Sequence, residues 1–296
     1  MFGEVLADVF PEQSVLGGAP FNVARHLQVF DLHPLLISRL GSDALGEALL
    51  QEMSQRGMDA SGMQRDADRL TGQVRVIFEN GTHRFDILPD QAYDHICDTT
   101  TGQAVAKTRP QLAYFGTLAQ RGAQSRMAAE RFLRDCECSL FLDINLRAPW
   151  YDEAVLTQSL DAAHIVKLNA EELVTLVSLL DLDGTEPEAQ ARSLQRRFHL
   201  EKVLVTLGDA GSWLLDAQQQ VTRAAPIKLQ QPMVDTVGAG DAYAAVFMLG
   251  LLRQWDVAVT LKRASVYAGA ICCSRGAAPA SAAAIQSFKQ SWGLET

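Results

Sequence analysis

The sequence of 296 residues lacks any apolar run of the roughly eighteen residues that a membrane helix requires. Its first residues lead into acidic Asp8 without the basic start and long apolar stretch of a signal peptide. The five cysteines are an odd number and include no C-x-x-C pair, so buried free thiols are the simplest interpretation. We therefore expect a reduced, cytoplasmic protein that does not contact membranes.

Basic residues are scarce relative to acidic ones: 26 Lys and Arg stand against 35 Asp and Glu, which gives a net charge of −9. This balance argues against a nucleic-acid-binding protein with a broad basic face. It still permits phosphorylated small molecules, because helix N-termini and backbone amides can bind them locally. The sequence also lacks H-E-x-x-H and G-x-S-x-G, so we expect neither a structural zinc site nor a serine hydrolase.

Apolar residues are abundant, at 48% of the chain, which is enough for a substantial core. Short apolar segments of strand length alternate with segments in which apolar residues recur at helical spacing. This alternation predicts an α/β fold with a mainly parallel sheet, and the lack of a linker predicts a single domain over 1–296. The predicted strands are 34–40, 111–116, 139–145, 163–169 and 202–208, and the predicted helices are 21–30, 45–53, 122–135 and 169–180.

Residues 72–88 break this alternation. Apolar and polar residues alternate there around Asn80-Gly81, a pair typical of a two-residue hairpin turn. A hairpin inside an α/β chain forms either an edge ribbon or a lid over a site. Further on, 239–271 contains two apolar helical runs that break near Asp256.

The densest candidate for chemistry is the segment 234–247, VDTVGAGDAYAAVF. Gly238, Ala239 and Gly240 open an apolar helical run, and such a helix start leaves backbone N–H groups available to an anion. At Gly240 we expect a positive φ and a close approach of backbone to phosphate. Asp241 stands where a carboxylate could accept a proton from an alcohol that attacks that phosphate. The structural alternative makes Asp241 an N-cap and the glycines a tight turn.

The segment 203–213, VLVTLGDAGSW, ends a predicted strand with T-x-G and has a second glycine three residues on. Such a turn lets the backbone pass close to a flat or charged ligand. A plain β-turn is the simpler interpretation. No G-x-G-x-x-G is present, which argues against a dinucleotide site and thus against a nicotinamide oxidoreductase.

Asn169 and Glu172 stand where another strand gives way to a helix, in the segment 167–172 (KLNAEE). Asn followed three residues later by Glu is the pattern of a capping box, which is the favoured interpretation of this segment alone. The functional alternative is that both side chains hold the water shell of Mg²⁺, a metal that takes few carboxylates and keeps much of its water.

Polar residues near the N-terminus could bind a polyol. Asp8 ends an apolar strand, where open α/β sheets place ligand groups, and Gly17-Gly18 would let a polyol approach the backbone. Asn22 can both donate and accept hydrogen bonds, although a turn followed by an ordinary helix explains the same residues. Arg147, in D-I-N-L-R after another strand, either binds a carboxylate or phosphate or lies in a surface ion pair.

Together these segments resemble the ribokinase-like (PfkB) family of carbohydrate kinases. The resemblance runs in the family's order from Gly3 to about Ala280. The motifs that carry it are D-T-V-G-A-G-D at 235–241, G-G-A-P-F-N at 17–22, G-S-D-A-L-G at 41–46 and N-A-E-E at 169–172.

The resemblance implies an ATP-dependent sugar kinase with a three-layer αβα domain and a small β lid, formed by about 9–16 and 72–95. It implies that Asp241 is the catalytic base and that the adenine lies near 265–269. The other implied positions are Gly238, Ala239 and Gly240 for the anion hole; Asn169, Thr206, Gly208 and Gly211 for the nucleotide; Asp8, Gly17, Gly18, Asn22 and Arg147 for the substrate; Glu172 and Asn169 for Mg²⁺ through water; and Asp235 for a monovalent cation such as K⁺.

The sequence departs from the family pattern in two places. The first lid segment, 9–16, is shorter than in many relatives, which leaves a lid-mediated homodimer open. Ala280 stands where members that bind a monovalent cation commonly have Ser, and Ser281 comes one step late.

The GGAP and DINLR patterns look most like fructokinases and 2-keto-3-deoxygluconate kinases. We expect a fructokinase-like enzyme whose partners are ATP and a small sugar, with no nucleic acid. The alternatives are a keto-deoxygluconate kinase and a non-catalytic member of the fold that senses sugar or nucleotide.

Overall fold

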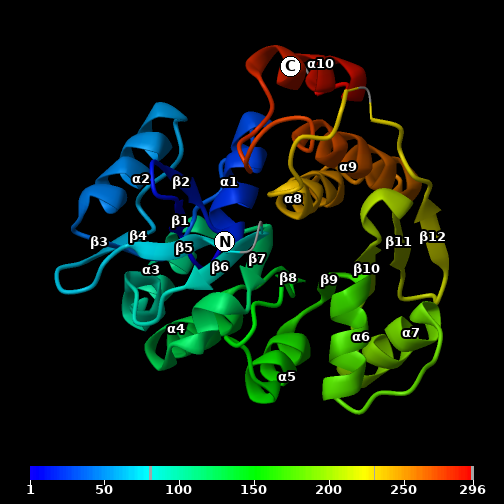
Figure 1. Cartoon of the computed structure of the whole chain (residues 1–296). Helices are drawn as coiled ribbons and strands as arrows, with labels where there is room; N and C mark the ends of the chain where they lie inside the picture. Colours follow the sequence, from blue (N-terminus) through cyan, green and yellow to red (C-terminus); the bar gives the residue numbers. More distant parts are fainter. Residues whose placement is uncertain (80–81, 230, 295–296) are drawn as a thin grey trace.

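A six-stranded sheet forms the middle layer of the molecule, in the order β12-β11-β10-β9-β8-β7 (Figure 1). The computed structural model describes residues 1–79, 82–229 and 231–294. The four strands from β7 to β10 run parallel, and β11 and β12 are antiparallel additions at one edge, so the prediction of a mainly parallel sheet is confirmed. The strands are β7 (Leu112–Gly116), β8 (Ser139–Asp143), β9 (Ile165–Asn169), β10 (Lys202–Thr206), β11 (Ser212–Leu215) and β12 (Val221–Ala224).

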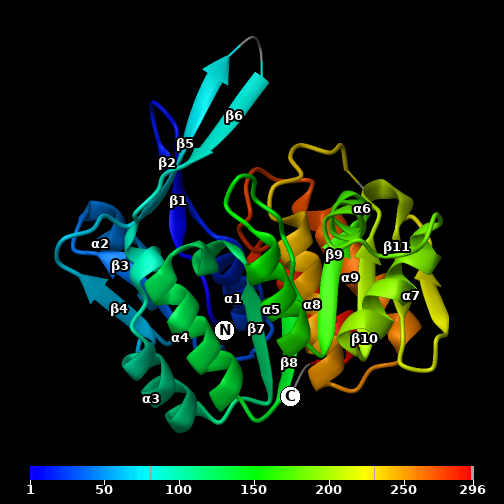
Figure 2. The same cartoon turned by 90° about the horizontal axis from the view of Figure 1, so that it is seen from below.

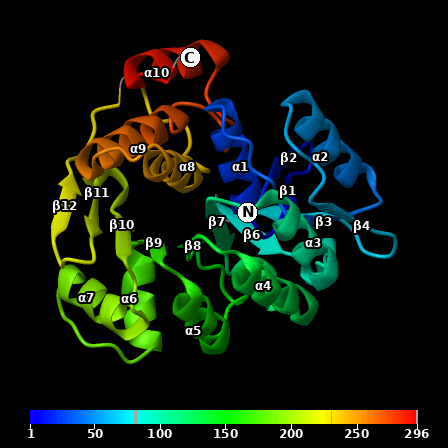
Figure 3. The same cartoon turned by 180° about the vertical axis from the view of Figure 1, so that it is seen from behind.

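Helices cover both faces of this sheet, which completes the predicted three-layer α/β architecture (Figures 1 and 3). Neighbouring strand residues point to opposite faces: Tyr114 and Phe141 belong to one apolar cluster, and Phe115 and Leu142 to the other. On the first face lie α1 (Ala19–Val29), α8 (Ala239–Leu252), α9 (Val257–Ile271) and α10 (Ala282–Trp292). On the second lie α3 (Asp98–Thr108), α4 (Ala123–Asp135), α5 (Glu153–Ala162), α6 (Ala170–Leu179) and α7 (Pro187–Phe198).

A separate four-stranded sheet projects from the body beside α1 (Figure 2). Its order is β2-β1-β5-β6, with β1 and β5 parallel and the outer pairs antiparallel. It contains both predicted lid segments, but it starts earlier, and 92–95 is a short 3-10 helix outside it. The Asn80-Gly81 turn lies outside the described residues. The strands are β1 (Leu6–Val9), β2 (Ser14–Gly17), β5 (Gly72–Glu79) and β6 (Thr82–Ile87).

The predicted strand 34–40 is wrong over its first half. Only β3 (Ser38–Gly41) forms, paired with β4 (Met63–Asp66) beside α2 (Ala44–Gln55). Ile37 makes an isolated parallel bridge to Phe2, and Phe2 makes another to Phe115. The apolar character of 34–36 therefore reflects burial without a strand partner.

The five cysteines are free, and Cys136 is the buried one, whereas the other four are half-buried. Within the described ranges, the helices are all too short or too polar to cross a lipid bilayer.

Candidate active site

A cavity of about 500 Å³ lies between the projecting sheet and the carboxyl ends of the central strands. The starts of α1 and α8 and the loop after β8 also line it. The sequence-predicted residues among its lining are Asp8, Gly18, Asn22, Arg147, Gly238, Gly240 and Asp241.

Asp241 lies in the first turn of α8, half-buried at the wall of this cavity. Its Oδ2 accepts a hydrogen bond of 2.7 Å from Nδ2 of Asn22. Burial raises the pKa of the Asp241 carboxyl to about 6, and the Asn22 bond acts in the opposite direction. Gly238 is the N-cap of α8, so the alternative that Asp241 is the N-cap is wrong.

The turn that opens α8 requires glycine at Gly238. Its φ is +79°, and a Cβ there would lie 2.2 Å from the Cβ of Ala277. The positive φ expected at Gly240 is therefore found two residues earlier, since Gly240 is already helical. Among the described residues, no side chain caps the start of α8. The predicted anion-hole residue Ala239 is already occupied, because its amide donates to the Thr236 carbonyl at 3.2 Å, and it does not line the cavity.

Lys167 and Asp143 form a buried ion pair behind this turn. Nζ of Lys167 lies 2.9 Å from each carboxylate oxygen of Asp143, and a Cβ on Gly240 would lie 3.6 Å from the same Nζ. Burial alone lowers the pKa of Lys167, but Asp143 outweighs it, so the pKa is raised and the ammonium stays charged. Sequence reasoning gave Lys167 no role, and a single charge inside the apolar strand IVKLN was the available signal.

Asp8 and Asn22 both line the cavity and lie close to Gly17. Burial raises the pKa of Asp8 to about 6. A Cβ on Gly17 would lie 3.9 Å from Asn22 and 4.0 Å from Asp8, and Gly18, at φ +101°, would clash with the Glu4 carbonyl at 2.7 Å. The absence of a side chain at Gly17 thus leaves room beside Asp8 and Asn22, whereas Gly18 allows the close approach of the Glu4 backbone.

Glu4 also lines the cavity, and sequence reasoning missed it. It is 3% exposed, and its Oε2 has no hydrogen-bond partner among the described residues. Burial raises the pKa of Glu4 to about 7, against smaller opposing effects of its own amide, of Arg147 and of the Ala19 amide. A charge inside the apolar segment FGEVLA was the signal for it.

Asn169 and Glu172 form the predicted capping box at the start of α6. Asn169 Oδ1 accepts from the Glu172 amide and Glu172 Oε2 accepts from the Asn169 amide, both at 2.8 Å. Glu172 Oε1 also accepts from the Leu146 amide at 2.8 Å, which ties the loop after β8 to α6. Arg147 follows in that loop, exposed, and within the described chain it forms no ion pair.

Thr206 lies beside Asn169, because the two residues pair at the carboxyl ends of β10 and β9. Gly208 and Gly211 have φ of +61° and +98°, and a Cβ on Gly211 would lie 2.3 Å from the Ala224 carbonyl oxygen. A short 3-10 turn and an antiparallel strand follow, as expected for a turn that is not a dinucleotide fingerprint. These residues, like the capping box, lie outside the lining of the first cavity.

A second cavity, of about 570 Å³, lies between α9, α10 and the chain before Gln231. Gly269 lines it, and a Cβ there would lie 2.3 Å from Ile227, so glycine allows this close packing. Two residues of the predicted adenine position 265–269, Val266 and Gly269, line this cavity, in which apolar side chains are mixed with polar ones such as Lys228 and Gln231.

Asp235 joins the turn before α8 to the loop after α9. Its Oδ1 accepts from the Val237 amide and its Oδ2 from the Gly276 amide, both at 3.0 Å. A monovalent cation at Asp235 would share oxygens that already bind the backbone.

In the part of the chain that the structure describes, no group of three or more His, Cys, Asp or Glu is arranged to hold an ion. The side-chain oxygen of Asn169 and both carboxylate oxygens of Glu172 already accept backbone amides, so these residues fit a Mg²⁺ ion that would arrive with a nucleotide and contact them through its water.

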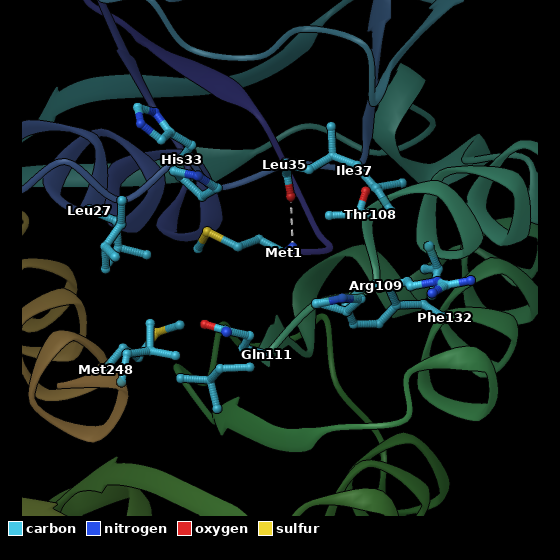
Figure 4. A pocket seen from close by; sticks show the side chains of 16 residues that line it. Met1, Leu27, His33, Leu35, Ile37, Thr108, Arg109, Gln111, Phe132 and Met248 are labelled. Carbon is cyan, nitrogen blue, oxygen red and sulfur yellow. Dashed lines mark hydrogen bonds between the residues drawn. The ribbon is translucent and has the colours of Figure 1, made fainter. Parts of the chain in front are cut away.

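A further cavity, of about 390 Å³, lies at the opposite, amino-terminal end of the central strands (Figure 4). Met1, His33 and Arg109 line it together with apolar residues such as Met248. None of the predicted site residues is among the described residues that line it.

Comparison with known proteins points to one family. A sequence model of the pfkB family carbohydrate kinases matches residues 3–284. A fructokinase of Salmonella typhimurium is 29% identical over 265 residues, which cover 85% of this chain and 83% of that protein. A sugar kinase of Pyrococcus horikoshii, PH1459, is 28% identical over 245 residues, which cover 80% of this chain and 73% of that protein.

The fold is also shared with solved structures. A fructokinase with bound ATP from Xylella fastidiosa superposes with a TM-score of 0.81 at 20% identity, covering 99% of this chain and 98% of that one.

Proposed function

Since the chain belongs to the pfkB family of carbohydrate kinases, we propose that it transfers the γ-phosphate of ATP to a hydroxyl of a neutral sugar, with fructose as the leading candidate. One observation carries the proposal: Asp241, the uncapped start of α8 and the polar residues Asp8 and Asn22 all line one cavity. The fructokinase relatives and the ATP bound by a fructokinase of the same fold support it.

In the proposed reaction, Asp241 accepts the proton of the sugar hydroxyl. The hydroxyl oxygen forms a bond to the γ-phosphorus, the bond to the bridging oxygen breaks, and ADP leaves with that electron pair. The first amides of α8 and the positive end of its dipole stabilise the charge on the transferred group. A pKa near 6 suits Asp241 to this task, since the carboxylate is free of a proton at neutral pH and still basic.

Magnesium, when bound with the nucleotide, offsets phosphate charge, and Asn169 and Glu172 are the residues that would lie beside it through water. The adenine is proposed to occupy the cavity beside Gly269, with Thr206, Gly208 and Gly211 along the nucleotide. The projecting sheet is proposed to act as a lid of the single domain that excludes water from the reaction.

The charge of the cavity favours a neutral sugar over a sugar acid. Three carboxyl groups line it, those of Glu4, Asp8 and Asp241, and Arg147 is the one cationic side chain among its described lining residues. A keto-deoxygluconate carboxylate would need Arg147 as its partner, because a guanidinium binds a carboxylate through two hydrogen bonds. That acid remains the second candidate for this reason alone.

Sugar-dependent release of ADP tests the proposal, measured with fructose, ribose, glucose, keto-deoxygluconate and nucleosides. We expect the highest kcat/KM with fructose, and no turnover of any sugar would contradict a kinase role. Arg147→Ala should leave the KM for fructose within about twofold. If the acid is the better substrate, and Arg147→Ala costs it about ten- to a hundredfold in kcat/KM, the neutral-sugar assignment is wrong.

A further inference from the structure

Arg25 is a buried cation on α1, 4% exposed, and it lies behind the cavity. Its Nη2 donates to Oδ1 of Asn22 at 2.5 Å, and Nδ2 of Asn22 donates to Asp241 at 2.7 Å. These two bonds form a continuous chain from guanidinium to amide to carboxylate. Burying a charge is costly, so its partners indicate what it does.

The other contacts of Arg25 are longer. The same Nη2 lies 3.3 Å from the Leu16 carbonyl and 3.4 Å from the Ala277 carbonyl, and Nη1 lies 3.7 Å from Glu52. The bond to Asn22 is therefore the dominant one.

We propose that Arg25 is a positioning residue, which fixes the direction of the Asn22 amide and thereby keeps Asp241 in its proton-accepting form. The inference rests on the proposed role of Asp241 as the base. It adds a residue that does not line the cavity and that acts on Asp241 through the Asn22 amide and, as a nearby positive charge, through space.

The direction of the Asn22 amide depends on which neighbouring atoms can donate a hydrogen bond. A guanidinium only donates, so it holds the amide oxygen of Asn22 toward itself and leaves the amide nitrogen for Asp241. If the amide turned over, its nitrogen would face Arg25, donor against donor, and its oxygen would face the Asp241 carboxylate, acceptor against acceptor. That turned arrangement is stable only when Asp241 carries a proton. Arg25 therefore disfavours the protonated pair.

Other charged groups face Asp241 from separate elements. Asp143 on β8 and Glu4 before β1 are negative, whereas Lys167 on β9 and Arg147 after β8 are positive. None of them is bonded to Arg25, so a substitution of Arg25 leaves their contributions in place.

The pH dependence of kcat distinguishes positioning from a merely structural role. Arg25→Met keeps a long side chain and removes the charge and all donors. We expect the acid limb of its pH profile, where kcat falls as Asp241 takes up a proton, to move up by about one pH unit. Turnover relative to the unmodified enzyme should then fall about fivefold at pH 6 and change little at pH 8. Arg25→Lys keeps a charge and a donor, and its acid limb should lie between the two.

Arg56→Met is the matched control, because Arg56 binds the same Glu52 through an Nε–Oε1 contact of 2.5 Å. Its acid limb should stay in place. If Arg25→Met does not fold, Arg25→Gln is compared with the unmodified enzyme instead. Gln has no charge, and its amide can accept as well as donate, so it does not fix the direction of the Asn22 amide.

An acid limb that stays in place in the Arg25 variants, with turnover lowered equally at every pH, would overturn the inference and leave the kinase proposal intact. Normal turnover by Asp241→Asn would instead remove Asp241 as the base, and with it this inference, whereas the proposed kinase activity would stand.

Discussion

Two helices, α8 and α6, begin at the same edge of the central sheet, but they differ in whether a side chain caps their first amides. α6 begins with a complete capping box, in which Asn169 and Glu172 satisfy its amides from within the chain. α8 begins at Gly238 with no side-chain cap, and a half-buried carboxylate, Asp241, stands in its first turn. A capped start stabilises a fold, whereas an uncapped start beside a cavity is available to a ligand.

Two buried glutamates, Glu172 and Glu4, differ in a similar way, in whether their carboxylate oxygens have hydrogen-bond partners. Both carboxylate oxygens of Glu172 accept backbone amides, so its burial is compensated. Glu4 is buried beside the start of α1, and among the described residues its Oε2 has no hydrogen-bond partner. We infer that the hydrogen bonds of Glu172 stabilise the fold, whereas the region around Glu4 and Asp241 is available to bind a ligand.

Of the substitutions at the two helix N-caps, Gly238→Ala is expected to have the larger effect, because it disrupts the uncapped start of α8. The added Cβ meets Ala277 and the positive φ becomes strained, so the turn must shift. A shift of about 1 Å in a phosphate-binding group can cost roughly a hundredfold in turnover. ADP-release kinetics with saturating sugar measure this; a kcat within twofold of normal would place the phosphate away from α8.

Glu4→Gln sharpens the contrast between the glutamates. The folded-state pKa of about 7 exceeds the ordinary value of 4.5, so the folded protein binds this proton more tightly than the unfolded chain. Burying the charged form therefore costs stability that grows from pH 4.5 to 7 and is constant above. At pH 8 the variant should be more stable by about 1–3 kcal/mol.

Urea unfolding at pH 8 and pH 5 tests this prediction, and the gain should shrink strongly at pH 5. A variant that is less stable at pH 8 would show that the Glu4 charge has a compensating partner.

The smallest effect is expected at the capped start. Asn169→Ala removes one half of the capping box and should lower the free energy of unfolding by about 1 kcal/mol. Urea unfolding and the KM for ATP are measured on the same preparation. A loss of turnover as large as that of Gly238→Ala would mean that α6 binds the transferred phosphate and that the two starts do not differ in kind.

The sequence predicted the central layers well, because each strand there carries its own apolar signal. Segments such as 139–145 and 202–208 differ from β8 and β10 by only two residues at one end. The parallel pairing of β1 with β5 could not be predicted, since it joins residues more than sixty positions apart. The failure at 34–36 has the same origin, as strand formation depends on a partner that no local pattern reveals.

The motifs pointed to residues of which seven line one cavity, but they did not reveal what holds these residues in place. Asp241 and Asn22 were both identified, yet their direct hydrogen bond joins residues 219 positions apart. Arg25 and Lys167 were overlooked because an isolated charge in an apolar segment gives no indication of its partner. Their roles follow only from three-dimensional neighbours.

Turnover by Asp241→Asn, measured as sugar-dependent ADP release alongside ATP binding, tests the central claim most directly. Asn keeps the shape of the side chain but cannot take the proton, so kcat should fall by roughly 10²–10⁴ while the Kd for ATP changes little. Turnover within a few-fold of normal would show that Asp241 is not the base and that the uncapped start of α8 has another purpose.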